Sequence, residues 1–167
     1  AYFKGTTKEK MLNYRDIKAP LPSALKEILD FVETYSIKEA FVGRDQRVDV
    51  SQYPPEAVRE LVVNALVHTD YSLQDAQIQV AVFSNRIEVI NPGGLSFGQT
   101  MKKALLGYSR LRNHVIGGVF RELKYIEQWG SGLQRIQSFC NKLGLKAPEF
   151  EDEGSHFRGV IFCDKTY

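Results

Sequence analysis

The chain has 167 residues, close to the common size of one domain, and its 43% hydrophobic and 25% charged residues are ordinary for a globular protein. A chain of this length can bury a core without metals or disulfides. Its formal net charge of +2 at pH 7 is too small by itself to indicate nucleic-acid binding, which requires clustered charge.

Residues 1–20 are polar and show no clear period, so we expect an N-terminal extension or linker there, followed by a single domain over residues 21–167. The apolar residues from Leu21 to Tyr35 recur at helical spacing. Alternation around residues 40–42 and 48–50 predicts a β-hairpin. A strong helix is predicted from Glu56 to His68, and Pro55 suits its first turn.

Two strands are predicted at residues 77–83 and 86–90, and the sequence Asn91-Pro92-Gly93-Gly94 predicts a break after them. Residues 95–129 mix helical fragments with glycines. A helix is predicted over residues 131–143 with Gly144 as its C-cap, followed by strands around 149–151 and 157–163. This order predicts an α+β fold, a two-layer sandwich of helices on a largely antiparallel mixed sheet.

Cys140 and Cys163 lie outside any metal-ligand spacing, and we interpret them as thiols in a reducing compartment. The sequence shows neither a secretory leader nor an apolar run of about 18 residues. We therefore expect a cytoplasmic protein that does not enter the membrane.

Glu60, Asn64 and His68 are spaced four residues apart and share one face of the predicted helix. A carboxylate there can act as a general base toward water, and an amide oxygen is a ligand suited to Mg²⁺. The alternative is a row of polar residues on a solvated face, and His68 alone could be a hydrogen-bonded residue at the helix end.

Two further groups could contact phosphates. Gly130 and Gly132 flank Ser131 at the start of a helix, where backbone N–H groups can approach an anion, although such a pair can also form a plain turn. Arg110 and Arg112 offer charged hydrogen bonds to phosphate, as part of a polar cluster; the alternative is a solvated surface or a contact to a partner domain. The cluster consists of Ser109, Arg110, Arg112, Asn113 and His114. Another basic set suggests a solvated face, with DNA contact as the alternative: Lys102, Lys103, Arg121 and Lys124.

Taken together, these residues resemble the Bergerat-type ATPases, which include gyrase, the heat-shock chaperone ATPase and sensor histidine kinases. The helix carrying Glu60 and Asn64 resembles their first box, in which the Glu orients or deprotonates water and the Asn holds Mg²⁺. Residues 91–94 stand where the Asp-containing box is expected, and residues 130–133 resemble the second glycine box. Residues 95–129 then take the place of the mobile ATP lid.

A closer resemblance, over roughly residues 20–165, is to the family of RecG-related helicases and transcriptional regulators. The sequences RELVVNALVHTDYS, NRIEVINPGGL, SRLRNHVIGGVFREL and IEQWGSGLQRI carry it. It implies a domain that binds ATP and Mg²⁺, with Glu60 as the catalytic residue and Asn64 as the metal ligand. The implied nucleotide-binding residues are Asn64, His68, Asn91, Gly93, Gly94, Arg110, Arg112, Asn113, Gly130, Ser131 and Gly132.

The resemblance also implies partners. In that family a Schlafen/AlbA-type DNA-binding domain usually precedes this one, so DNA would be reached through a neighbouring domain that this chain lacks, and a homodimer could form. Asn91 replaces the usual Asp, and its amide can both accept and donate a hydrogen bond, which weakens base selectivity. Glu60 favours hydrolysis, since the kinases lack this Glu, but without a P-loop nothing supports translocation along DNA.

The predicted function is therefore an ATP-binding domain of a transcriptional regulator, a slow ATPase that couples nucleotide state to a DNA-binding neighbour. The alternative is a non-catalytic module for dimerisation or protein interaction. A third hypothesis, direct DNA binding by this domain, would require a steep salt dependence of affinity.

Overall fold

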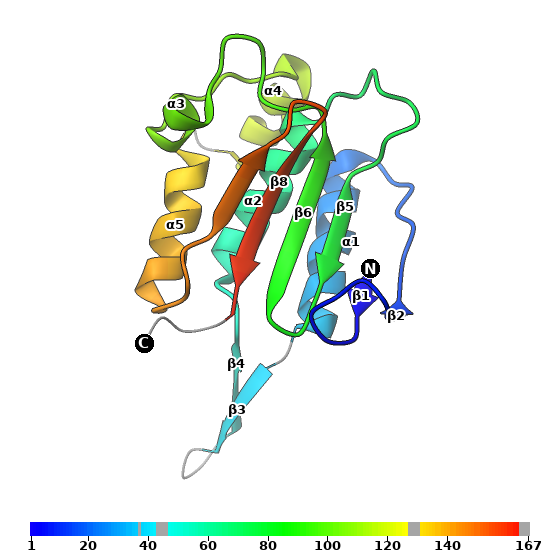
Figure 1. Ribbon diagram of the computed structural model, residues 1–167, viewed down its shortest axis with the longest axis vertical. Helices are drawn as coiled ribbons and strands as arrows, with labels where there is room; N and C mark the ends of the chain where they lie inside the picture. Colours follow the sequence, from blue (N-terminus) through cyan, green and yellow to red (C-terminus); the bar gives the residue numbers. More distant parts are fainter. Residues whose placement is uncertain (37, 43–46, 127–130, 164–167) are drawn as a thin grey trace.

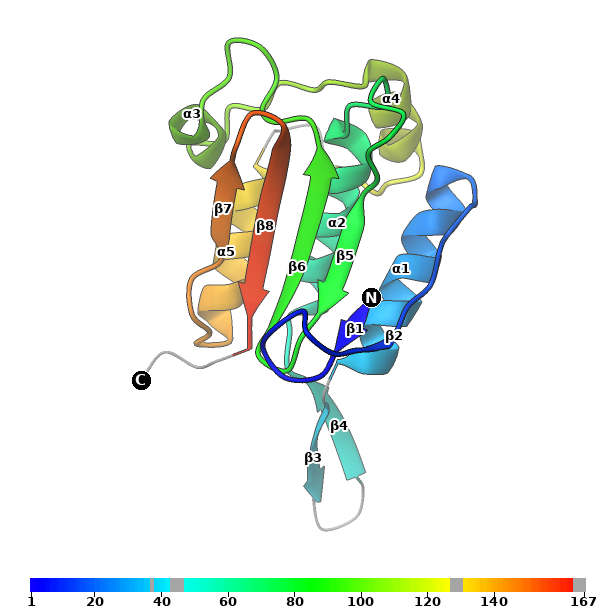
Figure 2. The ribbon, with the colours of Figure 1, turned by 45° about the vertical axis from the view of Figure 1, so that its right-hand side comes forward.

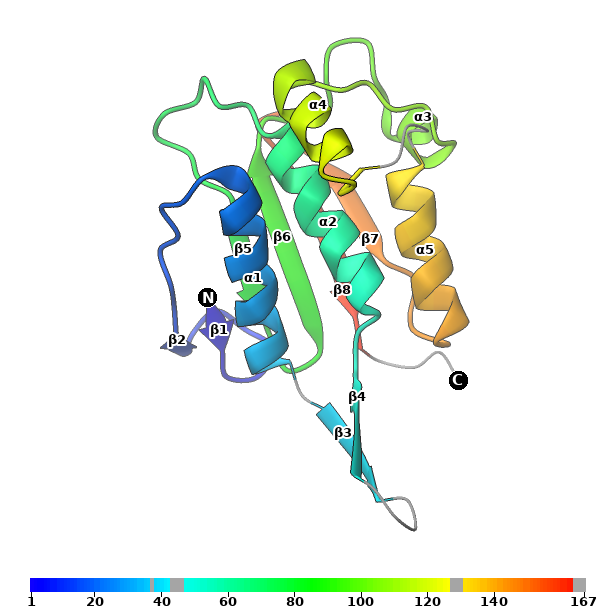
Figure 3. The ribbon, with the colours of Figure 1, turned by 180° about the vertical axis from the view of Figure 1, so that it is seen from behind.

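The computed structural model describes residues 1–36, 38–42, 47–126 and 131–163. Within these ranges the chain forms two layers, with three helices packed on one face of a six-stranded sheet (Figures 1 and 3). The helices are α1 (Leu21–Tyr35), α2 (Pro55–His68) and α5 (Gly132–Lys142). This arrangement confirms the predicted α+β class.

The strand order in the sheet is β2-β1-β5-β6-β8-β7, and among the described strands only β1 and β5 pair in parallel. The first 20 residues supply β1 and β2 at one edge. The strands are β1 (Tyr2–Phe3), β2 (Met11–Asn13), β5 (Gln79–Val82), β6 (Arg86–Pro92), β7 (Glu149–Asp152) and β8 (His156–Phe162).

Helix α2 lies between α1 and α5 and is apolar around most of its circumference, as expected of a helix buried on several sides (Figure 3). It packs closely on β8 because Gly159 has no side chain: a Cβ there would lie 2.4 Å from Cδ1 of Leu61. This close packing fixes the rotation of α2, and with it the direction in which its polar residues face.

The predicted helices and strands are confirmed with small shifts in their bounds. The helix predicted over residues 21–35 has those bounds, and the one predicted from Glu56 begins one residue earlier. Gly144 follows α5 with a φ of 66°, the left-handed conformation that favours glycine at a helix end.

The break predicted at residues 91–94 is wrong for its first half. Strand β6 continues through Pro92, with Asn91 opposite Phe157 and Pro92 opposite His156 on β8. The strand β5 on the other side reaches only to the partner of Ile90. Pro92 therefore occupies a position where one side of β6 has no neighbouring strand, so its missing N–H is tolerated.

The hairpin predicted around residues 40–50 is confirmed as β3 (Lys38–Val42) and β4 (Arg47–Ser51), a separate two-stranded sheet that projects from the body (Figure 2). Its turn, residues 43–46, lies outside the described residues.

We call residues 95–126 the lid segment, the described part of the predicted lid at 95–129. It contains two short helices, α3 (Met101–Leu105) and α4 (His114–Glu122), which lie beyond one end of the sheet (Figure 1). Across the described residues, none of the helices has both the length and the apolar character required to cross a bilayer.

Candidate functional site

A cavity of about 820 Å³ lies between α2, the end of β6, the lid segment and the start of α5. Most of the sequence-predicted site residues meet in its lining: Glu60, Asn64, His68, Asn91, Gly94, Arg110, Ser131 and Gly132. Gly93, Arg112 and Asn113 lie outside the lining, and Gly130 falls outside the described residues. Residues far apart in the sequence thus form one ligand-sized pocket.

The start of α5 lies directly against the polar face of α2. A Cβ on Gly132 would lie 2.6 Å from Oε1 of Glu60 and 2.8 Å from Nδ2 of Asn64. Real Cβ atoms essentially never come that close to another atom. The absence of a side chain at position 132 is therefore what allows the helix N-terminus to reach Glu60 and Asn64.

Glu60 is buried, with 7% of its surface exposed, and its Oε2 accepts a hydrogen bond of 2.7 Å from Nη2 of Arg135. The two side chains form an ion pair between α2 and α5 inside the cavity lining. Arg135 is not among the site residues predicted from the sequence. The available signal was its position one helical turn after Gly132, on the face that this glycine brings against Glu60.

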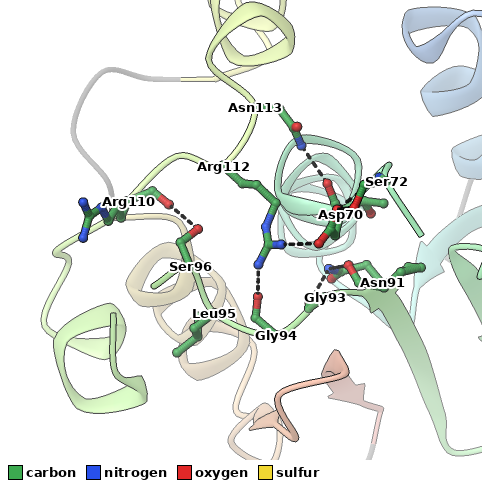
Figure 4. Close-up of polar contacts among 12 residues, drawn as sticks. Asp70, Ser72, Asn91, Gly93, Gly94, Leu95, Ser96, Arg110, Arg112 and Asn113 are labelled. Carbon is green, nitrogen blue, oxygen red and sulfur yellow. Dashed lines mark hydrogen bonds and ion pairs between the residues drawn. The ribbon is translucent and has the colours of Figure 1, made fainter. Parts of the chain in front are cut away.

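Asn91 is buried at the end of β6 and is 3% exposed. Its Nδ2 donates to the carbonyl oxygens of Pro92 and Gly93, both at the long distance of 3.4 Å (Figure 4). These bonds orient the amide so that Oδ1 is the acceptor left for a ligand, and within the described ranges no protein donor contacts it. The amide can thus serve as an acceptor, the property that the corresponding Asp would have.

Arg112 connects the lid segment to two loops (Figure 4). Its Nη1 pairs with Oδ2 of Asp70 at 3.0 Å, and its Nη2 donates to the Gly94 carbonyl at 2.6 Å. Hydrogen bonds from Ser72, with a smaller contribution from the Arg112 charge, hold the pKa of Asp70 below its usual value. Arg112 therefore ties the loop after α2 to the loop after β6.

The neighbouring Asn113 makes a second anchor. Its Nδ2 donates to the carbonyl oxygens of Val67 and Thr69, each at 2.7 Å, at the C-terminal end of α2. These carbonyls are among those that a helix end leaves without intrahelical partners. Arg112 and Asn113 together fix the middle of the lid segment to the body, because both terminal nitrogens of Arg112 and Nδ2 of Asn113 bond to the protein itself.

His68 lines the cavity at the end of α2. Burial, with a smaller contribution from the positive charge of Arg112, lowers its pKa to about 4. His68 is therefore neutral at pH 7, where it can exchange hydrogen bonds with a ligand but cannot supply a positive charge. The cationic groups of the lining are Arg110, Arg121 and Arg135.

A metal site made by the protein alone is not found in the part of the chain that is described: no three or more His, Cys, Asp or Glu side chains gather there. Mg²⁺ commonly binds without such a cluster, through one or two protein oxygens and the phosphates of a substrate.

The chain is similar to a known protein family. A family model described as "Putative ATP-dependent DNA helicase recG C-terminal" matches residues 75–161, just over half of the chain. The matched residues include Asn91, the lid segment and Gly132, whereas α2 precedes them. No curated protein matches the chain.

A solved structure, that of the DIP2311 protein from Corynebacterium diphtheriae, is similar with a TM-score of 0.81 and 19% sequence identity. The similarity covers 98% of this chain and 34% of that one. At this identity the likeness concerns the fold alone, and the chain spans about a third of the length of that protein.

Proposed function

This chain belongs to the family of RecG C-terminal domains, and from that membership we propose that it is a Bergerat-type domain that binds ATP together with Mg²⁺. The observation that carries the proposal is the cavity, which brings Glu60 and Asn64 of α2 together with Asn91 of β6 and Gly132 of α5, three separate parts of the chain. Its volume of about 820 Å³ lies within the range of small-molecule sites, about 300–1,000 Å³.

The residues present fit a nucleotide at both of its ends. Asn91 offers a buried amide acceptor for the exocyclic amino group of a base. The N-terminus of α5, with Ser131 and Gly132, can place backbone N–H groups on the phosphates, and the helix dipole favours an anion there. Arg110 and Arg121 add positive charge to the lining.

Asn64 would hold Mg²⁺ through its amide oxygen, with phosphate oxygens and water completing the shell, and the ion would neutralise charge on the phosphates. Glu60 would accept a proton from water as the water attacks the γ-phosphorus. The bond from that phosphorus to the bridging oxygen would break, and ADP would leave. In the state described here one oxygen of Glu60 pairs with Arg135, so Arg135 positions this carboxylate.

We place this activity in a cytoplasmic transcriptional regulator, in which nucleotide state would be coupled to a neighbouring DNA-binding domain. The buried thiol of Cys140 supports the reducing location. The second candidate is a non-catalytic module for dimerisation or protein interaction. One observation favours it: the Glu60 carboxylate is engaged by Arg135. The resemblance to Bergerat-type ATPases also favours it, because it implies an Asp at the position of Asn91.

Isothermal titration calorimetry with MgATP tests the proposal. We expect binding by the wild-type chain that Asn64→Ala weakens about tenfold, the scale of one hydrogen bond to a charged group. Asn141→Ala, the same change at an exposed position of α5, is the control and should bind normally. Glu60→Gln should keep binding and lower turnover by at least about 100-fold. No heat of binding at about 1 mM ATP would overturn the proposal in favour of the non-catalytic module.

A further inference from the structure

The positive charge of this chain is concentrated in the lid segment. No Asp or Glu occurs between Glu88 and Glu122, whereas that stretch holds Lys102, Lys103, Arg110, Arg112 and Arg121. The rest of the chain then has 17 Lys and Arg against 20 Asp and Glu, a net charge of −3. The overall charge of +2 is therefore the sum of +5 in this stretch and −3 in the rest of the chain. Such clustering of positive charge is the electrostatic footprint of nucleic-acid binding.

Most of these charges are available to a partner. Arg112 is paired with Asp70, but the side chains of Lys102, Lys103, Arg110 and Arg121 are exposed. Over the described ranges, no acidic side chain lies within ion-pair distance of these four. Lys102 and Lys103 also lie outside the cavity lining, so a nucleotide in the cavity would not occupy them.

Exposed aromatic rings lie in the same segment. Phe97 is 97% exposed and Tyr108 is 67% exposed, unusual values for large apolar side chains. Hydrogen bonds hold the backbone at both residues: Arg110 donates to the Phe97 carbonyl at 2.7 Å, and Gln99 donates to the Tyr108 carbonyl. Short α3, which carries Lys102 and Lys103, lies between them in the chain. Two exposed rings are thus combined with a run of cations.

We propose that the outer surface of the lid segment, formed by Phe97, Lys102, Lys103 and Tyr108, binds single-stranded nucleic acid. Lysines would contact the phosphates, and the rings would stack on bases, which expose their faces only when unpaired. A duplex is disfavoured because α3, with five residues, is too short to follow a groove. Phe97, Lys102 and Lys103 lie outside the cavity lining, whereas Tyr108 also lines the cavity. Because binding is tested without nucleotide, the proposal stands whether or not the cavity binds ATP.

Fluorescence anisotropy of a labelled 20-mer of deoxythymidine, measured without nucleotide over a range of salt concentrations, tests the proposal. Two neighbouring lysines are changed in Lys102→Ala/Lys103→Ala, and Lys8→Ala/Lys10→Ala is the control at exposed positions near the N-terminus. Removing two phosphate contacts should reduce the slope of log affinity against log salt by about 1.4, since each contact on a single strand contributes about 0.7. The control should keep the wild-type slope.

The aromatic contribution is tested separately. Phe97→Ala should weaken binding about tenfold without changing the salt slope, whereas Tyr14→Ala, which removes a 65% exposed ring near the N-terminus, should have no effect. An oligouridine of equal length shows whether RNA is bound as well as DNA. The proposal is overturned if the 20-mer does not bind at low salt, if a duplex binds as tightly, or if the control variants lose as much affinity. Circular dichroism of each variant shows that the fold is retained.

Discussion

Gly132→Ala tests the closest contact in the site. The new Cβ would lie 2.6 Å from Oε1 of Glu60, 2.8 Å from Nδ2 of Asn64 and 3.2 Å from its Oδ1. Ordinary contact begins at 3.4 Å, so Glu60 and the start of α5 must separate by about 0.8 Å. Glu60 cannot simply rotate away, because its carboxylate is buried and is held by Arg135.

The size of the effect follows from two opposing terms. Overpacking costs about 1–3 kcal/mol, while replacing a helical glycine by alanine returns up to about 1 kcal/mol. We expect Gly132→Ala to lower the free energy of unfolding by about 1 kcal/mol. The matched control is Gly118→Ala in α4, where a Cβ meets nothing within 4 Å. In this variant only the gain from replacing a helical glycine by alanine applies, so it should be stabilised by up to about 1 kcal/mol.

Urea unfolding followed by circular dichroism measures both variants. The same shift of about 0.8 Å displaces the polar groups of Glu60 and Asn64, so MgATP turnover by Gly132→Ala should fall by roughly 10- to 100-fold, the penalty of misplacing reacting groups by about 1 Å. If Gly132→Ala is stabilised as much as Gly118→Ala and turns over ATP at the wild-type rate, the close approach of α5 to α2 is refuted.

Three further changes test other contacts. The pKa of His68 is about 4 in the folded chain and about 6.5 in the unfolded chain, so the unfolded state binds the proton first as pH falls. The free energy of unfolding should therefore fall by the order of 3 kcal/mol between pH 6.5 and pH 4. The urea midpoint of His68→Gln should fall less than that of the wild-type chain over the same pH range. In Arg112→Lys, one ammonium group cannot reach both the Asp70 carboxylate and the Gly94 carbonyl. Amide hydrogen exchange across α4 should therefore be faster than in the wild-type chain, while exchange across α1 is unchanged. If α4 exchanges at the wild-type rate, Arg112 does not anchor the lid segment. Arg135→Met removes this cation from buried Glu60 and should lower the free energy of unfolding in urea by about 2 kcal/mol at pH 7; an unchanged free energy would contradict a stabilising ion pair.

The parts of the site that the sequence predicts are those governed by local periodicity. Glu60, Asn64 and His68 share a helix face because of their spacing, and the structure places all three in one cavity. The glycine at position 132 signals close backbone approach, and Glu60 and Asn64 are what it approaches. The order of helices and strands likewise follows from hydrophobic periods and from proline and glycine positions.

The parts that the sequence does not predict depend on contacts between distant residues. Arg112 was expected to contact phosphate, yet it lies against Asp70, 42 positions away, and nothing in either local sequence specifies that pairing. Strands β1 and β2 also have no periodic signal: they are two and three residues long and are held by backbone hydrogen bonds at the sheet edge. Short edge strands and long-range ion pairs are specified by tertiary packing, which single-sequence patterns do not encode.

The anchors at Arg112 and Asn113 divide the lid segment into two functional parts. The part from Asn113 onward is tied to α2, whereas residues 95–109 carry the exposed ring of Phe97 and the lysines of α3. Arg110 lies at the boundary, lining the cavity while donating to the Phe97 carbonyl. If both proposals hold, a phosphate in the cavity would compete for the Arg110 guanidinium and release Phe97. Nucleotide state would then alter the nucleic-acid surface through one side chain, without movement of the anchored half.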